Sequence, residues 1–507
     1  MKILGLAAPF GNNASAALLI DGKIVTAAEE DRFTREKHAP GQCPANAVRF
    51  CLETAGIKPS EVDIVACLSQ GQKTLVNNTL SECNFSIEKT KIERVEHPIA
   101  HIASSFYFSG FKEAAILLLD GCEENISIFL GSARGKEINR IKKITAPDSL
   151  GDFYAAATGY LGFKREDGGY EAMGMAPYGD PKKINFDHTD SYEKLLAKFG
   201  PKRTGDKLSE PYIHIAAAAQ AKLEEITLRL IDSCLLDELK RHGTLCFAGS
   251  YALNISLNRK LLEHPYIKNI WVQPAANDAG ASLGAAAYAA AKFNENIEPM
   301  EHVYLGPGFS DKEIEKAIKV SGFTFEKPPD ICQRAAELLA QGKIVGWFQG
   351  RMEWGPRALG NRSILGNPSV KGTNDKINAI IKFREKWRPF CPSILEEYAQ
   401  DILGSKHPSP FMTLSFNVTP QWKNRIPEAV HVDGTARPQV VSKNINPKFY
   451  SLIKDFHKKT GIPVVINTSL NRRGEPMVCA PKDALTLFKE TGLENLAIGD
   501  FLVTKNN

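Results

Sequence analysis

Paired cysteines, long apolar runs and an excess of one charge are all missing from this sequence. The ten cysteines are scattered and form no Cys-x-x-Cys pair, which argues against a disulfide framework and indicates reduced, mostly buried thiols. The Ala-rich run 279–291 is too short and interrupted to span a membrane, so it predicts a buried helix. The apolar stretch after Met1 is broken by Gly11 to Asn13, too early for a signal peptide.

The charge balance narrows the choice of partners. The formal net charge is only +5 over 507 residues. Such a balance suits anionic small substrates, whereas nucleic-acid binding needs a clustered basic face. The sequence therefore predicts a cytoplasmic protein with no nucleic-acid partner and no membrane partner.

Length and composition predict several globular domains. The chain is 43% hydrophobic and 24% charged, as in soluble globular proteins, and it is too long for one ordinary core. Between about 294 and 329 the composition becomes polar and proline-rich. We expect the domain boundary there, between residues 1–300 and 301–507.

The first domain contains what looks like a repeated strand–turn–strand pattern. Residues 2–8 and 15–20 predict strands, and Asp21-Gly22 predicts a hairpin turn into a third. A strand at 114–120, a polar turn and a strand at 126–131 repeat this pattern. Two such halves are the layout of actin-like ATPases, in which the turns cradle phosphates. The alternative, two unrelated hairpins, stays open on the pattern alone.

Candidate metal ligands lie near the second repeat. His97 and His101 are four residues apart on a predicted helix that Pro98 helps to start, so both imidazoles face one side. Asp120 and Asp278 each follow a predicted strand, where α/β proteins gather functional groups. Alternatively, His97 and His101 are ordinary helix residues without a metal, and Asp278 caps a helix.

A glycine turn marks a candidate nucleotide site. The strand 244–248 is followed by Gly249, Ser250 and, at the start of the next helix, Asn254. Such a junction suits adenosine or phosphate, because backbone can approach closely and the helix N-terminus is positive. Residues 220–239, before this strand, predict a long surface helix.

The last 200 residues carry many cations in turn-like, Gly- and Pro-punctuated contexts. Charge runs are usually solvated surface, but here the cations alternate with apolar residues, which favours a lined anion pocket. A polar turn from Asn467 to Ser469 ends a buried strand and could bind a carbonyl or phosphate oxygen. The cations are Arg351, Arg357, Arg362, Lys382, Arg384, Arg388 and Arg437.

Several longer motifs together resemble those of the NodU/CmcH carbamoyltransferases over essentially the whole chain. This resemblance implies an α/β fold in which a TsaD-like domain of the actin-ATPase superfamily, residues 1–300, precedes an α+β YrdC-like domain, residues 301–507. The matching motifs are AEEDRFTREKH (28–38), HPIAH (97–101), LDG (119–121), MGMAPYG (173–179), VQPAANDAG (272–280), GRMEWGPRALGNRS (350–363), HVDGTAR (431–437) and INTSLN (466–471).

The resemblance implies two reactions at two sites. In the YrdC-like domain, carbamoyl phosphate would yield carbamate, which would attack ATP, taken up with Mg²⁺, to give carbamoyl-adenylate. Lys382, Arg388, Arg437 and Ser469 match the positions that grip this substrate, with Asn467 beside them.

In the TsaD-like domain, the resemblance implies an iron site and a transfer step. Fe²⁺, or Mn²⁺ or another divalent ion, would be held by His97, His101, Asp120 and Asp278, a ligand set that suits these metals. The carbamoyl group would pass to a hydroxyl of a small molecule, as in natural-product or antibiotic biosynthesis. The family leans towards homodimers.

The departures from the family pattern fall in the first domain. Asn12 and Asn13 stand where family members have His and Asp, and asparagine cannot act as a base at neutral pH. Glu171 replaces a lysine and Ser250 a glycine, whereas Lys37 at the transfer site is retained. Three hypotheses follow: an O-carbamoyltransferase with another base, a relative that uses amine or acid acceptors, or a non-catalytic subunit. An actin-type sugar kinase is a further alternative, but it gives no reason for the C-terminal cations.

Overall fold

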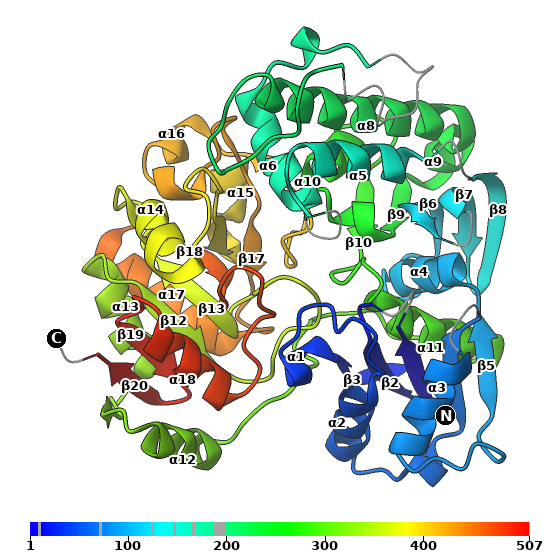
Figure 1. Cartoon of the computed structure of the whole chain (residues 1–507), viewed down its shortest axis with the longest axis horizontal. Coiled ribbons are helices and arrows are strands. Elements are labelled where there is room, and N and C mark those ends of the chain that lie inside the picture. Colours follow the sequence, from blue (N-terminus) through cyan, green and yellow to red (C-terminus); the bar gives the residue numbers. More distant parts are fainter. Residues whose placement is uncertain are drawn as a thin grey trace. The chain divides into compact units, whose positions relative to one another are not determined.

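The computed structural model describes residues 1–8, 12–69, 73–123, 126–145, 149–164, 168–186 and 198–505 (Figure 1). The chain divides into two compact units, one formed by Met1–Glu96 with Asp278–Asn507 and the other by His97–Asn277. The predicted boundary near residue 300 lies inside the first unit and stays a prediction.

The N-terminal part of the first unit is a mixed five-stranded sheet in the order β3-β2-β1-β4-β5, with β1, β2 and β3 antiparallel and β1, β4 and β5 parallel. Its strands are β1 (Lys2–Ala7), β2 (Ser15–Ile20), β3 (Lys23–Glu29), β4 (Ile64–Leu68) and β5 (Ile92–Val95). The accompanying helices are α1 (Asp31–Thr34), α2 (Ala45–Ala55), α3 (Lys73–Glu82) and α11 (Gly280–Lys292).

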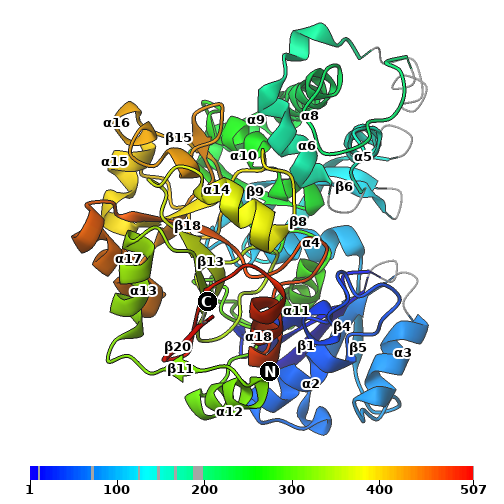
Figure 2. The same ribbon diagram turned by 60° about the vertical axis from the view of Figure 1, so that its left-hand side comes forward.

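Helices cover both faces of this sheet because successive side chains of β1 point to opposite sides. Leu4 and Leu6 join a core cluster with α2. The intervening Gly5 faces α11, and a Cβ atom there would lie 1.9 Å from the Ser282 carbonyl oxygen. Glycine at this position therefore lets α11 pack closely on β1 and β4, as Figure 2 shows.

The C-terminal part of the first unit is a mixed eight-stranded sheet in the order β11-β20-β19-β12-β13-β18-β14-β17. Its strands are β11 (Phe325–Glu326), β12 (Val345–Phe348), β13 (Arg362–Gly366), β14 (Cys391–Leu395), β17 (Gln439–Val441), β18 (Val464–Ser469), β19 (Asn495–Ile498) and β20 (Phe501–Thr504); β15 (Phe416–Asn417) and β16 (Thr435–Ala436) pair separately. The helices are α12 (Asp311–Ser321), α13 (Ile331–Ala340), α14 (Thr373–Ile377), α15 (Ala399–Leu403), α16 (Pro420–Lys423), α17 (Pro447–Thr460) and α18 (Pro481–Glu490).

The second unit is built around a sheet in the order β10-β9-β6-β7-β8. Its strands are β6 (Glu113–Glu123), β7 (Ile126–Arg134), β8 (Glu137–Ile144), β9 (Thr244–Ala248) and β10 (Asn269–Val272). Its helices are α4 (His97–Phe106), α5 (Leu150–Tyr160), α6 (Gly169–Met175), α8 (Tyr212–Cys234), α9 (Leu236–His242) and α10 (Ile255–Leu262).

The two five-stranded sheets have the same topology, which confirms the predicted duplication. In each, the first strand pairs antiparallel with the second and parallel with the fourth, and the order of strands is three-two-one-four-five. The fold class is therefore that of the actin-like ATPases, followed by the predicted mixed α and β region. Residues 9–11 and 124–125, which belong to the predicted phosphate-cradling turns, lie outside the described residues.

The predicted long surface helix at 220–239 was wrong in two respects. The structure has α8, which begins eight residues earlier, and a separate α9. The first half of α8 is buried through its Ala216–Ala219 run, because these small residues let neighbouring helices approach.

Two predictions from composition can be compared with the described residues. Cys51, Cys67, Cys83 and Cys246 are buried free thiols, as expected. Among the helices described, none combines the length and apolarity needed to cross a bilayer.

Candidate active site

The C-terminal sheet sets the positions of the predicted anion-binding residues. Asn467 and Ser469 lie two residues apart on β18 and therefore face the same side of the sheet. In the register, Asn467 lies opposite Cys391 of β14 and Leu365 of β13. Ser469 is at the end of β18, where the polar turn begins.

Lys382 reaches this end of β18 from the end of a π-helical turn, Asn378–Lys382, that continues α14. Its side chain is 3% exposed. The ammonium group donates to the Ser469 carbonyl, to Ser469 Oγ at 3.0 Å and to Asn471 Oδ1 at 2.6 Å. These partners are all neutral oxygens, so the positive charge is held in place without being neutralised.

The electrostatic environment disfavours the protonated form of this lysine. Burial lowers the pKa of Lys382 well below its ordinary value, and the nearby charges of Arg384, Arg388 and Lys37 lower it further. A bound anion would raise the pKa of Lys382 again, because its negative charge stabilises the protonated form of the lysine. Anion binding at this lysine stays a prediction from the sequence.

Two further predicted cations lie beside β14. Arg437 donates from Nε to the Cys391 sulfur at 3.0 Å, and Cys391 lies opposite Asn467. Arg388 lies 3.7 Å from the buried carboxylate of Glu385. The structure thus brings Lys382, Arg388, Arg437, Asn467 and Ser469 to one region of the sheet.

Arg362 and Arg351 donate to backbone carbonyl groups. The Arg362 side chain is fully buried, and its guanidinium donates to the Gln349 carbonyl at 2.6 Å and to the Pro307 carbonyl at 3.0 Å. Arg351 donates to the Gly306 carbonyl and also reaches the Val25 carbonyl. Both arginines hold loops together, an arrangement that does not favour the phosphate contacts predicted for them.

Arg357 and Arg384 are less enclosed. Arg357 is half-buried in the loop between β12 and β13. Arg384 donates to Asn378 Oδ1 at 2.7 Å and stacks over the Phe390 ring. Arg384 therefore acts on Lys382 through charge, not through a direct contact.

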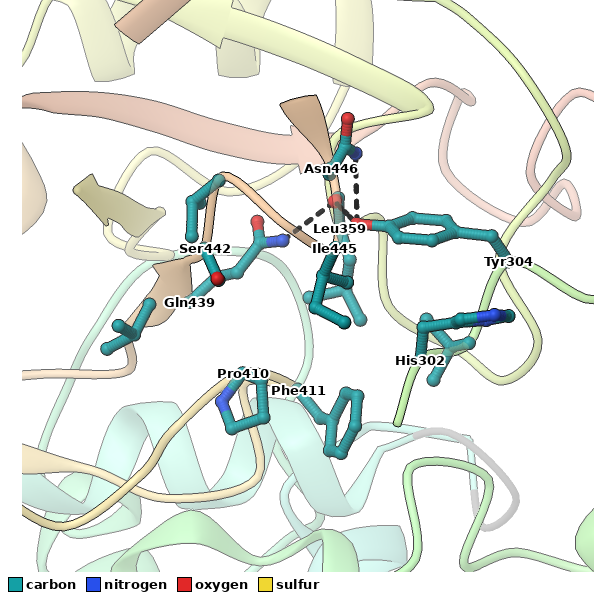
Figure 3. Close-up of a pocket in the computed structure, with 12 residues that line it drawn as sticks. His302, Tyr304, Leu359, Pro410, Phe411, Gln439, Ser442, Ile445 and Asn446 are labelled. Carbon is teal, nitrogen blue, oxygen red and sulfur yellow. Dashed lines mark hydrogen bonds between the residues drawn. The ribbon is translucent and has the colours of Figure 1, made fainter. Parts of the chain in front are cut away.

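A small cavity of about 40 Å³ lies behind this region, lined by His302, Tyr304, Leu359, Gln439 and Asn446 among others. Figure 3 shows the Gln439 amide nitrogen directed at the Leu359 carbonyl, which the Tyr304 hydroxyl also reaches. On its other side, Gln439 accepts from Ser393 at 2.7 Å and from Asn467 at 3.1 Å. Gln439 thus separates the cavity from the anion-binding residues.

Residues at the end of β3 and in and after α1 hold the loops around this site. The buried Glu29 and Arg32 form an ion pair, and Glu29 accepts from the Gly355 backbone N–H at 3.2 Å. Arg35 donates to the Pro476 carbonyl at 2.9 Å and to the Met477 carbonyl. The segment that carries Lys37 is therefore anchored to the loops next to Lys382.

The turn with Asn12 and Asn13, where family members have a histidine, contacts another histidine, His38. Asn12 is half-buried, and Asn13 adopts a left-handed backbone conformation with φ 51°. The amide nitrogen of Asn13 lies 3.5 Å from Asp278 Oδ2, and its oxygen lies 2.9 Å from Nδ1 of His38. Since a carboxylate only accepts, this amide orientation makes Nδ1 of His38 the donor.

In the second unit, the predicted metal ligands cluster on α4 and β6. The Nε2 atoms of His97 and His101 lie 2.9 Å apart, and Asp120 Oδ2 is 3.2 Å from Nε2 of His101. All three side chains are at least nine-tenths buried. Two imidazole nitrogens and a carboxylate oxygen that converge in this way fit a divalent cation. Asp278 begins the other unit, so its part in this set stays a prediction.

The predicted nucleotide turn packs against this cluster. Gly249 has φ 89°, and a Cβ atom there would lie 2.4 Å from the Leu119 carbonyl oxygen and 3.3 Å from Asp120 Oδ2. Ser250 opens a 3-10 turn, Ser250–Leu253. Asn254 is the N-cap of α10 and also bonds Gln220 through both ends of its amide. Asn254 is therefore occupied by a structural role.

Comparison with known proteins identifies the relatives of this chain. The carbamoyltransferase N-terminus family matches residues 2–83, 69–205 and 193–287, and the carbamoyltransferase C-terminus family matches residues 336–505. The chain belongs to the carbamoyltransferase family. It is a transferase, and carbamoyl transfer is the chemistry that its two matched domains share.

Two curated proteins and one solved structure illustrate what this chain is similar to. The nodulation protein NolNO of Sinorhizobium fredii is 35% identical over 99% of this carbamoyltransferase and 80% of the relative. The nodulation protein NolO of Bradyrhizobium diazoefficiens is 36% identical over 81% of this chain and 79% of the relative. Among solved structures, full-length HypF in a phosphate- and nucleotide-bound form has a TM-score of 0.39 at 14% identity, covering 58% of this chain and 46% of HypF.

The geometry adds residues of this carbamoyltransferase that the sequence did not single out. Asn471 contacts both Lys382 and Ser469, and Gln439 and Ser393 orient Asn467. Asn471 ends a motif that resembles the family pattern, which was a usable signal. Gln439 and Ser393 carry no such signal, because only strand pairing brings them beside Asn467.

Proposed function

We propose that this carbamoyltransferase forms carbamoyl-adenylate from carbamoyl phosphate and ATP, and then transfers the carbamoyl group to a hydroxyl of a small molecule. The first reaction belongs to the residues around β18, and the second to the duplicated domain. Adenylation suits this chemistry because carbamate is a poor acyl donor, whereas AMP is a good leaving group.

The donor reaction proceeds in two steps. Water cleaves carbamoyl phosphate into carbamate and inorganic phosphate. A carbamate oxygen then attacks the α-phosphorus of ATP, the bond to the β-phosphate breaks, and pyrophosphate leaves. Mg²⁺ taken up with ATP would balance the charge of the pyrophosphate. Lys382 and Arg388 would stabilise the negative charge that develops on the phosphoryl oxygens.

The observation that supports the donor reaction is the set of contacts that Lys382 makes. Its buried ammonium group touches only neutral oxygens, from Ser469 and Asn471. An unneutralised buried charge is costly unless a ligand supplies the opposite charge. A phosphoryl group from carbamoyl phosphate is the anion that the family assignment suggests.

In the transfer reaction, the acceptor oxygen attacks the carbamoyl carbon, the bond from that carbon to the AMP oxygen breaks, and the acceptor loses its proton. A cation such as Fe²⁺ or Mn²⁺, held by His97, His101 and Asp120 and expected to bind Asp278 too, would offset the charge of the AMP leaving group. The ammonium group of Lys37 would also stabilise the negative charge of the AMP leaving group.

The acceptor proton needs a base other than Asn12, because an amide does not take up a proton at neutral pH. His38 is the candidate, since an imidazole can accept a proton there and Asn13 fixes which ring nitrogen carries hydrogen. The same departure at Asn12 supports a second candidate function, transfer to an amine or acid acceptor that needs less help from a base.

The first test is to mix the purified protein with carbamoyl phosphate, Mg²⁺ and ATP labelled at the α-phosphate. We expect pyrophosphate, with the label in carbamoyl-adenylate or in the AMP that its hydrolysis by water releases, and both should depend on carbamoyl phosphate. ADP in their place would indicate a kinase, and no nucleotide turnover would indicate a non-catalytic subunit. Hydroxylated and amine acceptors added to the productive mixture then distinguish the two transfer reactions.

The remaining parts of the proposal concern its setting. We also propose that the protein is cytoplasmic and forms a homodimer. Its small-molecule acceptor would belong to natural-product biosynthesis. Nucleotide binding at Gly249 and Ser250 would place the adenylate next to Asp120.

A further inference from the structure

Glu29 and Arg32 form a buried ion pair in the motif 28–38, in which the resemblance implies a role for Lys37 alone. Glu29 ends β3 and Arg32 lies in α1, and both side chains are at least nine-tenths buried. Nη2 of Arg32 donates to Oε1 of Glu29 at 2.9 Å, and Nε donates to Oε2 at 3.2 Å. Two parallel hydrogen bonds of this kind fix the direction of both side chains.

The ion pair holds one residue of a loop far away in the sequence by both of its backbone groups. The N–H of Gly355 donates to Oε1 of Glu29 at 3.2 Å, and its carbonyl accepts from Nη2 of Arg32 at 3.3 Å. Gly355 has φ 97°, a left-handed conformation that glycine adopts without strain. The two atoms that form the ion pair therefore also fix the backbone of this loop.

The same loop is held again four residues later. The N–H of Leu359 donates to Oε1 of the buried Glu353 at 2.7 Å. The Leu359 carbonyl accepts from the Gln439 amide at 2.7 Å and from the Tyr304 hydroxyl at 2.8 Å (Figure 3). Both ends of the segment 355–359 are therefore bonded to side chains through N–H and carbonyl alike.

Arg357 is the middle residue of this segment and is half-buried. The residue before it is Pro356, whose ring fixes its own φ. Beyond Leu359, Gln439 accepts from Asn467 of β18 at 3.1 Å, so the segment is joined to the donor residues. Arg357 is thus a cation on a short segment whose backbone has little freedom.

We infer that Glu29 and Arg32 are positioning residues for the donor reaction, because through Gly355 they set the place of Arg357. The guanidinium of Arg357 then meets the anionic substrate without first having to be ordered. The inference rests on the proposed function, since it takes Arg357 as one of the cations of the donor site.

Energetics favour positioning over stability as the role of this pair. A buried ion pair adds little net stability, because the loss of water offsets much of the attraction between its charges. Apolar side chains of similar volume would fill the same space, but they could bond neither backbone group of Gly355. Glu29 and Arg32 supply an acceptor and a donor side by side in one fixed direction, which is what holding a single peptide group requires.

The test is a double-mutant cycle on the full-length protein, with the rate of pyrophosphate formation from saturating ATP and carbamoyl phosphate as the readout. Arg32→Lys keeps the charge beside Glu29 but loses the planar fork that also reaches Gly355. We expect a loss of about 10²-fold from this change in the wild type. In Arg357→Met the same change should cost less than about 2-fold, because Arg32 acts through Arg357.

The matched control is Arg334→Lys, since Arg334 of α13 pairs with Glu326 at 3.0 Å and is partly exposed. This variant should keep the rate of its parent in both backgrounds. Equal losses from Arg32→Lys in the two backgrounds would show a general structural defect and overturn the inference. A wild-type rate in Arg32→Lys or in Arg357→Met would also overturn it.

A second variant removes both charges of the pair together. Glu29→Leu/Arg32→Met leaves no lone buried charge, so we expect it to fold, as circular dichroism can check, and yet to lose as much rate as Arg32→Lys. If Arg32→Lys does not fold, this variant takes its place in the cycle. A folded double variant with the wild-type rate would overturn the inference.

Failure of the proposed function has a separate signature. A wild type that forms no pyrophosphate from ATP and carbamoyl phosphate would overturn the proposed function. The cycle is then measured on the calorimetric affinity for carbamoyl phosphate, where additive effects of Arg32→Lys and Arg357→Met would overturn the inference and non-additive effects would support it.

Discussion

The ammonium nitrogen of Lys382 lies 2.6 Å from the amide oxygen of Asn471. A buried lysine beside a neutral amide has no counter-ion at that contact, whereas a carboxylate partner would supply one. Asn471 also accepts from Ser469 Oγ at 2.6 Å and donates to the Glu475 carbonyl at 2.7 Å, so its position is fixed by the loop after β18.

Replacing this lysine should disable the donor reaction. In Lys382→Met the methionine fills the buried space but carries no charge, and we expect pyrophosphate formation to fall by about 10²- to 10³-fold, as for the loss of one preorganised donor. The rate of pyrophosphate release from ATP in the presence of carbamoyl phosphate measures this. Lys376→Met, a change of an exposed lysine on α14, should leave the rate unchanged, and an equal loss in both variants would contradict the assignment.

Binding of carbamoyl phosphate should take up a proton. Burial holds the pKa of Lys382 well below its ordinary value, so part of the protein is neutral at this residue above the lowered pKa, and the anion favours the charged form. The affinity should therefore fall as pH rises through the lowered pKa. Calorimetry in two buffers of different ionisation enthalpy measures the uptake, and Lys382→Met should abolish it.

The same residue should also affect stability. Because its folded-state pKa is depressed, the unfolded chain binds the extra proton, so the cost of burying Lys382 is absent above pH 10.5 and complete below the lowered pKa. Lys382→Met should therefore gain stability over the wild type as pH falls. Denaturant midpoints of both proteins across this range test the sign, and a gain that grows with rising pH would contradict it.

The histidine pair on α4 should hold a metal ion. We expect His101→Asn to lower the iron or manganese content of the purified protein by at least ~10-fold, because it removes a direct ligand. Elemental analysis of the purified protein measures the content. His264→Asn is the control, since His264 pairs with Asp232 elsewhere in the same unit; similar metal content in all three proteins would argue against the site.

Arg362 should be needed for stability and not for substrate affinity. In Arg362→Met, the Gln349 and Pro307 carbonyls lose their buried donor, and we expect a loss of about 3 kcal/mol in the free energy of unfolding. Chemical denaturation measures the loss, with the exposed Arg49→Met as control. If Arg362→Met keeps its stability but loses affinity for carbamoyl phosphate, the result would support the prediction that Arg362 binds the anion.

His38 should matter for transfer but not for activation. In His38→Gln, a side chain that can still donate to Asn13 but cannot take up a proton, we expect carbamoyl transfer to fall by about 10²-fold while pyrophosphate formation from ATP and carbamoyl phosphate is unchanged. Asn12→His, which restores the family residue, should raise transfer. Parallel loss of both reactions in His38→Gln would indicate a structural role.

Much of the fold could be predicted from the sequence because local patterns specify it. Strands at 15–20 and 244–248 match β2 and β9 residue for residue, since buried β-rich runs bounded by turns are local signals. The helix that pairs His97 with His101 followed from spacing and from the proline at its start. The duplication was visible as a repeated pattern, although the sequence alone could not distinguish it from two unrelated hairpins.

The partners of the polar side chains were decided only by the tertiary structure. Arginines in glycine- and proline-rich motifs look alike in sequence, yet Arg362 donates to carbonyls of distant loops while Arg437 reaches the sulfur of Cys391. Asn254 caps α10, a contact that the sequence did not predict, and its nucleotide contact stays a prediction.

By itself, therefore, the sequence determined the strands, the helix bearing the histidines and the family of this protein, because these depend on the order of neighbouring residues. The tertiary structure decided the state of the donor site. Whether the oxygen of Asn467 is satisfied depends on Gln439, and the direction of Gln439 depends on the Leu359 carbonyl 80 residues earlier. Hydrogen bonds of this kind are set by strand pairing and packing between segments far apart in the chain, and no local pattern encodes them.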